Sequence, residues 1–216
     1  MQGYFTKYSQ RVYSLLLGSY TKCSDRNNNH RKGQIMSKKI KLIVGSTRQN
    51  RVGGAIAAWL VGVAKDNGVE LEVIDLKQEN LPVFDGKSPM YFGPQTDTDR
   101  AWSAKITEAE AIIFVTAEYN RSIPAPLKNA IDTLFKEWND KPAAIVSYGY
   151  VDAGGSVTKH LTDVLNWVKM KIVEPNVAIT LSQDFFTEDG TFKDANAALA
   201  DAKAPFIAAL QALNQA

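Results

Sequence analysis

From Ile40 onward, short β-rich runs alternate with segments of helical periodicity, and this alternation constrains the fold more than any other feature of the chain. The pattern predicts strands over 40–45, 69–76, 111–117, 143–149 and 173–180. It predicts helices over 53–66, 124–136 and 155–169, and a closing helix that bends near Pro205. Parallel strands need long crossover connections, usually helices. We therefore expect an α/β domain whose parallel sheet is covered on both faces.

Two strands have a predicted place in that sheet. The run AIIFVTA at 111–117 is the most apolar and is expected to be central. Pro175 cannot donate a ladder hydrogen bond, so the last strand is expected at an edge.

The 216 residues suit one folded domain, which we place at residues 36–216. Residues 1–35 carry six Lys or Arg and one acidic residue, and they lack a core pattern. We interpret them as a basic, disordered extension, with organelle targeting as the alternative. The stretch Met36-Ser37-Lys38-Lys39 directly precedes the first strand and looks like a natural start.

Composition excludes several function classes. A formal net charge of +2 gives no reason to expect nucleic acid or an anionic membrane as a partner. No apolar run reaches the ~20 residues that span a bilayer. Cys23 is the single cysteine, and only two histidines occur, so neither a disulfide within the chain nor a Cys- or His-rich metal site is expected. A reducing compartment, by default the cytoplasm, is predicted.

The turn after the first strand is suited to an anion. Ser46 and Thr47 supply hydroxyls, Arg48 and Arg51 supply guanidinium groups, and Gly53 opens the next helix. The start of a helix offers free N–H groups and a positive dipole end, which favour phosphate. The spacing matches neither the Walker loop nor the dinucleotide glycine motif. The alternative is a turn that contains glycine for conformational reasons and whose arginines are exposed to solvent.

A second polar cluster follows the central strand, in TAEYNRSIPAPLKNAIDTLF. If the first and third strands are neighbours, Glu118, Tyr119 and Asn120 lie beside the first turn, at the edge where such sheets bind ligands. Their backbone amides, with Asn120 and Ser122, are suited to the edge of a flat heteroaromatic ring. Leu127 and Ile131 in the following helix are spaced for the core instead.

GSTRQNRVG and AEYNRSIPAPLKNAID resemble the two signature loops of the NAD(P)H-dependent FMN reductase family. The resemblance covers about residues 38–210, and the second motif is the more specific. It implies a flavodoxin-like three-layer sandwich with a five-stranded parallel sheet of order 2-1-3-4-5. Members often have proline where Ala117 stands, glycine where Ala125 stands and serine where Arg51 stands. The role of Arg51 is therefore the least certain.

The resemblance also implies roles for individual residues. The first loop would hold the FMN phosphate through Ser46, Thr47, Arg48, Arg51 and Gly53. The second loop would hold the isoalloxazine ring through Glu118, Tyr119, Asn120, Arg121 and Ser122. A third loop, SYGYVDAGGS, would meet the other side of the ring through Ser147, Tyr148, Gly149, Gly154 and Gly155.

The implied chemistry is hydride transfer from NADPH or NADH to FMN, followed by ping-pong reduction of free flavin, quinone, azo dye or a similar acceptor. It needs no catalytic side chain and no metal. A non-enzymatic electron carrier of the flavodoxin type is the main alternative. A classical dehydrogenase with Asp75 on a ribose, or a scaffold with a vestigial flavin fold, is less well supported.

Family members pair through a second subunit, so a homodimer or homotetramer is expected. The segment 77–97 is long and irregular, and it contains aromatic residues, including Tyr91 and Phe92, that a single domain could not easily bury. Trp102 and Trp138 are interpreted as further interface anchors.

Overall fold

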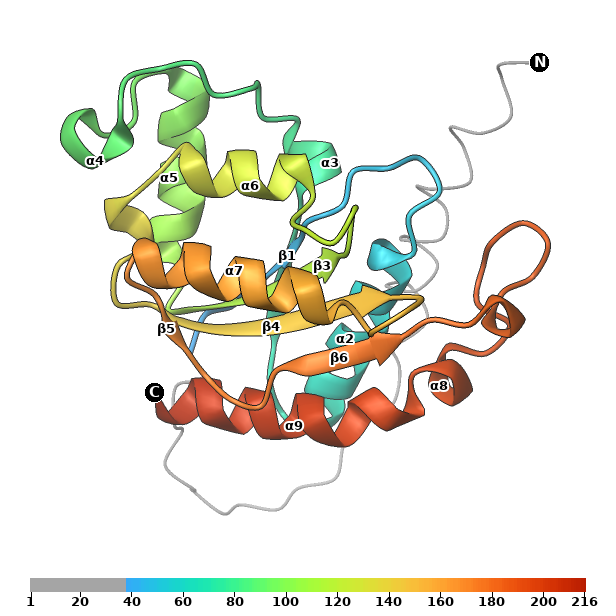
Figure 1. The fold of residues 1–216 in the computed structure, drawn as a ribbon. Coiled ribbons are helices and arrows are strands. Elements are labelled where there is room, and N and C mark those ends of the chain that lie inside the picture. The colour runs from blue at the N-terminus through green and yellow to red at the C-terminus, as the bar shows by residue number, and fades with distance from the viewer. Residues whose placement is uncertain (1–37) are drawn as a thin grey trace, which may run out of the picture. The chain divides into compact units, whose positions relative to one another are not determined.

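The computed structural model describes residues 38–216, in which one parallel sheet has the strand order β2-β1-β3-β4-β5, with β6 also paired to β4 (Figure 1). The predicted order is confirmed. The strands are β1 (Ile40–Val44), β2 (Leu71–Asp75), β3 (Ala111–Ala117), β4 (Pro142–Gly149), β5 (Lys171–Ile172) and β6 (Val177–Thr180). The predictions made for residues 1–35 lie outside the described residues.

Helices cover both faces of the sheet (Figure 1). The longer ones are α2 (Gly53–Asp66), α5 (Asp97–Glu108), α6 (Ala125–Asp132), α7 (Gly155–Trp167) and α9 (Ala200–Gln215). Short turns of helix are α3 (Leu76–Glu79), α4 (Pro89–Phe92), η1 (Lys136–Trp138), η2 (Gln183–Phe185) and α8 (Ala195–Ala198). None of the helices within residues 38–216 is long and apolar enough to cross a membrane.

Successive side chains of a strand point to opposite faces of the sheet. The core therefore consists of two apolar clusters, one on each face of the sheet. In β3, Ile113 and Val115 face the cluster that contains α2 and α9, whereas Ile112 and Phe114 face the cluster that contains α5, α6 and α7. All seven residues of β3 are buried, as expected for a central strand.

The fifth strand position departs from the prediction. A single strand over 173–180 was expected, but β5 and β6 pair separately with the two ends of β4. Pro175 lies in the gap between them, where it has no N–H to add to the ladder. The predicted edge position is confirmed.

The tryptophans correct another expectation. Trp102 and Trp138 are 1% and 0% exposed. Their rings pack edge to face, with 6.2 Å between the ring centroids. Their indole N–H groups donate to the carbonyl oxygens of Ala130 and Ile131, at 2.8 and 3.0 Å. They anchor α5 and η1 beneath α6, so they are core residues and not interface anchors.

Candidate functional site

Three loops meet at the carboxyl edge of the sheet because β1, β3 and β4 are neighbours. Gly45, which directly follows β1, donates its N–H to the carbonyl of Val115 at 2.9 Å. Glu118, which follows β3, donates to the carbonyl of Tyr148 at 3.1 Å. All fifteen residues predicted to hold the cofactor lie on these loops, at the end of β4 or at the first turns of α2 and α7.

The first loop is tied to the second by side chains. Ser46 is buried, and its hydroxyl makes a short hydrogen bond with the hydroxyl of Tyr119. The guanidinium carbon of Arg48 lies 4.8 Å from the centre of the Tyr119 ring, within cation–π range. The Arg48 side chain is otherwise exposed, so its donors are available to a ligand.

The start of α2 is open to an anion. Among the described residues, no side chain caps its first N–H groups, and its first turn holds no acidic residue. Free N–H groups and the positive dipole end therefore remain available at Gly53. Thr47, just before this point, lines a pocket of about 400 Å³ together with Lys77 and Asn129.

Arg51 is held by Asp75, which was not predicted to belong to the phosphate site. Its Nη2 donates to the carboxylate of Asp75 at the end of β2, and both side chains are largely buried. Asp75 also accepts from the N–H of Lys77 and so caps α3. Within residues 38–216, the second guanidinium nitrogen, Nη1, is buried and finds no acceptor.

Two more buried polar atoms at this edge lack a protein partner among the residues that the structure describes. They are the hydroxyl of Tyr148 and Oε2 of Glu118. The Tyr148 side chain points to the α2 side of the sheet, where a Cβ added to Gly53 would lie 2.6 Å from its oxygen. Buried polar groups nearly always have partners, so a group without one is a pointer to a bound ligand.

The second loop is a tight turn. Tyr119 and Ser122 exchange both backbone hydrogen bonds at 3.0 Å, and Asn120 and Arg121 have φ values of 49° and 67°. Two positive φ angles are typical of a two-residue hairpin turn, which asparagine tolerates far better than arginine. Such strain is concentrated at functional sites.

Side chains of the second loop reach its neighbours. Arg121 lies 3.4 Å from a carboxylate oxygen of Asp152 and 3.9 Å from one of Glu118. Ser122 shares a hydrogen bond of 3.1 Å with Nδ1 of His160 in α7. His160 is exposed on this helix.

The third loop folds back on β4. The Ser147 hydroxyl donates to the carbonyl of Ala153 at 2.8 Å. Gly154 has a φ of 80°, and a Cβ there would lie 2.9 Å from the Ser147 Cβ. Gly149 lies against the Gly154 backbone, and Gly155 begins α7. These contacts require glycine at 154 and bring the start of α7 to the same edge.

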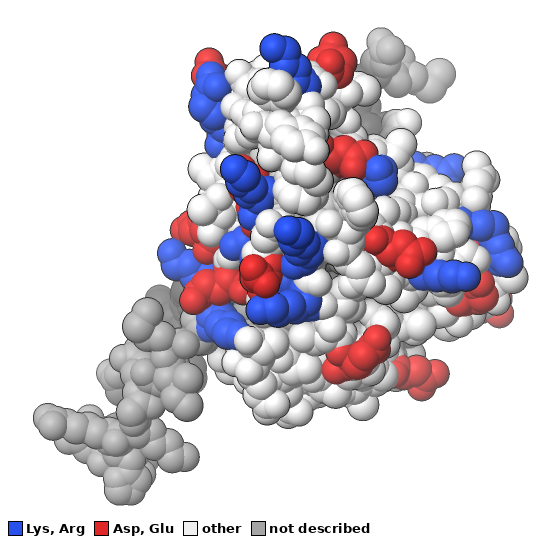
Figure 2. All heavy atoms as spheres, turned by 60° about the vertical axis from the view of Figure 1, so that its left-hand side comes forward, with Lys and Arg blue, Asp and Glu red and all other residues white. Residues whose placement is uncertain are grey.

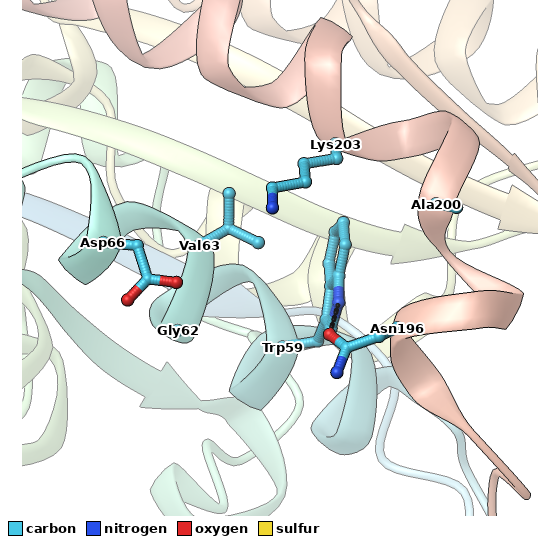
Figure 3. A pocket seen from close by; sticks show the side chains of 7 residues that line it. All are labelled: Trp59, Gly62, Val63, Asp66, Asn196, Ala200 and Lys203. Atoms are coloured by element: carbon cyan, nitrogen blue, oxygen red, sulfur yellow. Dashed lines mark hydrogen bonds between the residues drawn. The ribbon is translucent and has the colours of Figure 1, made fainter.

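Two other surface features lie apart from this edge. A pocket of about 470 Å³ between α2 and the α8–α9 segment includes Trp59, whose indole donates to Asn196, but none of the predicted cofactor residues (Figure 3). On the face shown in Figure 2, basic and acidic side chains are interspersed, without a broad patch of one sign. No group of three His, Cys, Asp or Glu suited to a metal occurs within residues 38–216.

The geometry thus brings together an uncapped helix start, a buried hydroxyl and two arginines beside the ends of β3 and β4. A phosphate at α2 and a flat ring between the second and third loops would use these groups.

Comparisons with known proteins agree with this arrangement. A model of the family described as NADPH-dependent FMN reductase matches residues 38–184. An NAD(P)H-dependent FMN reductase of Schizosaccharomyces pombe is 37% identical over 150 residues, which cover 68% of this chain and 74% of the relative. A probable NADPH:quinone oxidoreductase of Oryza sativa is 30% identical over 163 residues, covering 73% and 83% of the two chains.

Among solved structures, the flavoenzyme NAD(P)H:(acceptor) oxidoreductase FerB from Paracoccus denitrificans superposes with a TM-score of 0.66. The match covers 82% of this chain and 98% of that one at 23% identity, and it shows that the two folds are alike.

Proposed function

This chain belongs to the NADPH-dependent FMN reductase family, and on that basis we propose that it passes electrons from NAD(P)H through FMN to a small-molecule acceptor such as a quinone or free flavin. It is an oxidoreductase with FMN and NAD(P)H as cofactors. The names of its relatives favour quinones and free flavin as acceptors. Azo dyes are a further candidate, and the cytoplasm is the expected compartment.

One observation carries the phosphate part of this proposal. Arg51 Nη1 is buried and has no acceptor among the described residues, and it belongs to the loop that opens the uncapped helix α2. A phosphate there would accept from Arg51, Arg48 and the Ser46 hydroxyl, which belong to the loop that leads into α2 and are held by Asp75 and Tyr119. The residues present therefore fit the phosphate of FMN.

The second and third loops would hold the ring. We assign this role to Glu118, Tyr119, Asn120, Arg121 and Ser122 on one side and to the backbone of Ser147–Gly149 on the other. The hydroxyls of Ser122 and Ser147 already have protein partners, so these serines would contribute through their backbone. Gly154 and Gly155 keep the start of α7 close to the ring.

Bound FMN supplies the redox chemistry, because it accepts a hydride and returns electrons to a second substrate. The second and third loops would position the ring, and their backbone N–H groups would stabilise negative charge on its edge. No side-chain acid or base is assigned. If both substrates use one exposed ring face in turn, the kinetics follow a ping-pong scheme.

A second subunit would complete the site. Val83, Tyr91 and Phe92 are 85%, 78% and 60% exposed in the segment between β2 and α5. Exposed aromatic side chains grouped in this way are typical of interfaces. We propose that this segment contributes to a homodimer, or to a tetramer built from dimers.

The test begins with the visible spectrum of the purified protein. The proposal predicts flavin bands that NADPH or NADH bleaches within turnover time under anaerobic conditions, and that a quinone restores. Initial rates with varied nucleotide and quinone should give parallel double-reciprocal lines. Bands that the nucleotides do not bleach would favour the electron carrier, and a protein that neither contains nor binds FMN would overturn the proposed site.

A further inference from the structure

The hydroxyl of Tyr148 is a buried hydrogen-bond donor, and the packing of the core gives no reason for a polar group at this position. The residue is 4% exposed and lies on the α2 side of β4, among apolar side chains of the core. Within residues 38–216 its oxygen has no hydrogen-bond partner. Leaving a buried hydroxyl unpaired is unfavourable, and phenylalanine would fill the same space without that penalty.

The hydroxyl is aimed at the start of α2. A Cβ built on Gly53, the first residue of this helix, would lie 2.6 Å from the Tyr148 oxygen. Any larger residue at 53 would therefore push the hydroxyl away. With glycine there, the hydroxyl lies next to the free N–H groups of the helix start, and one acceptor can meet both.

The groups around this hydroxyl are suited to an anion. The Ser46 side chain interacts with the Tyr148 hydroxyl, although the two groups do not meet the distance and angle of a hydrogen bond, and Arg51 lies near enough to act through its charge. The Ser46 oxygen is engaged with Tyr119, and Arg51 Nη1 is itself a buried donor without an acceptor among the described residues. Two unpaired donors at one helix start need an acceptor with several lone pairs, which a phosphate provides.

Tyr148 is protonated throughout the useful pH range. Burial raises the pKa of its hydroxyl well above the ordinary value of 10, and the nearby Tyr119 adds to the rise. The smaller opposing effects of Ser46 and Arg51 do not reverse it. The group can therefore donate a hydrogen bond but cannot repel an anion as a phenolate.

We propose that Tyr148 is a phosphate-binding residue, whose hydroxyl donates to the FMN phosphate beside Arg51, and that Gly53 is needed to let it reach. The inference rests on the proposed function. It differs from the role that the resemblance implies for Tyr148, which is contact with the far side of the ring.

The test compares FMN with riboflavin, which lacks the phosphate, in fluorescence titrations of the apoprotein. For Tyr148→Phe we expect FMN to bind about tenfold more weakly, the scale of one hydrogen bond to a charged group. Riboflavin affinity should not change. The apoprotein should melt at the same or a higher temperature, because the change removes an unpaired buried hydroxyl.

Two further variants sharpen the result. Thr133→Val removes a buried hydroxyl at the end of α6, outside the three loops, and should leave both affinities unchanged. Gly53→Ala should weaken FMN binding in the wild-type background and have a smaller effect when combined with Tyr148→Phe, because the phenyl ring lacks the clashing oxygen.

The possible results of these titrations distinguish a failure of this inference from a failure of the proposed function. If Tyr148→Phe keeps the full preference for FMN over riboflavin, or weakens both flavins equally, Tyr148 does not bind the phosphate. A melting temperature that falls on Tyr148→Phe would show a structural role and overturn the inference. If the wild-type protein itself shows no preference for FMN, the phosphate site of the proposed function fails, and this inference fails with it.

Discussion

Arg51 and Asp75 form a largely buried ion pair that joins the loop after β1 to the end of β2. The two residues are 24 positions apart, and neither belongs to a motif that contains the other. The pair fixes one nitrogen of the guanidinium group and leaves the other, Nη1, buried and without an acceptor among the described residues.

Breaking this pair should destabilise the apoprotein. In Asp75→Asn the amide can still accept from Lys77 and cap α3, so the main loss is the charge that faces Arg51. Removing one partner of a buried pair costs about 3–5 kcal/mol. We expect the lower end of this range in urea unfolding, because Arg51 keeps some contact with solvent. FMN should restore part of the loss. The exposed pair Arg100–Asp97 provides the control, since Asp97→Asn should have no measurable effect.

Arg48→Ala tests the phosphate loop from its exposed side. The expected loss of FMN affinity is about 1.5–3 kcal/mol, because a charge-assisted hydrogen bond is removed. Fluorescence titration measures it, and riboflavin affinity should change much less. Arg100→Ala in α5 is a matched control far from the loops. Equal FMN affinity in wild type and Arg48→Ala would place the phosphate elsewhere.

The Lys41 network at the opposite edge of the sheet should make stability depend on pH. Lys41 is buried and donates to Glu72 and Glu108 at 3.1 and 2.9 Å. Hydrogen bonds from Lys41 and Lys39 hold the pKa of Glu108 below its ordinary value of 4.5. A carboxylate with a lowered pKa stabilises the fold above its unfolded pKa, and this contribution is lost as the pH falls through the folded value.

Glu108→Gln should therefore be less stable than wild type at pH 7, and the difference should shrink as the pH falls below 4.5. Urea unfolding of both proteins between pH 7 and pH 3 provides the measurement. Glu188→Gln, for which the structure shows an exposed side chain outside this network, is the control. A difference that stays constant with pH would mean that Glu108 acts through packing.

Light scattering decides the oligomeric state. The chain has a mass of 23.8 kDa, so a homodimer should scatter as about twice that value at micromolar concentration. Replacing both Tyr91 and Phe92 by glutamate should shift the protein toward the monomer, since charge at an apolar interface is costly. Trp167→Glu alters an equally exposed aromatic residue at the end of α7 and should leave the mass unchanged. A wild-type mass near that of one chain would rule out the dimer.

A chain that begins at Met36 should fold and bind FMN as the full chain does. Among residues 38–216, both apolar clusters of the core are built from side chains between Ile40 and Leu213, and Lys38 donates a hydrogen bond to the Leu213 carbonyl. Thermal melting and FMN titration of the two chains would test this. A large fall in melting temperature on shortening the chain would show that residues 1–35 contribute to the fold.

Sequence patterns within short segments predicted most of the strands and helices. β-branched runs, helical spacing and the position of Pro175 are properties of short segments, and they predicted a parallel sheet with its last strand at an edge. The helix Asp97–Glu108 and the separation of β5 from β6 were not predicted. The short strand β5 holds only Lys171 and Ile172, too few residues for a period to be recognised.

By itself, the sequence determined which loops meet at the carboxyl edge of the sheet, because parallel strands end at one edge and the signature residues follow those ends directly. Only the tertiary structure decided what each side chain meets there. The face on which Tyr148 lies, its approach to Gly53, the pairing of Arg51 with Asp75 and the burial of Trp102 all depend on strand register and on packing between segments distant in the chain. Such contacts leave no period or spacing in the local sequence, because they are set by the packing of whole elements against one another.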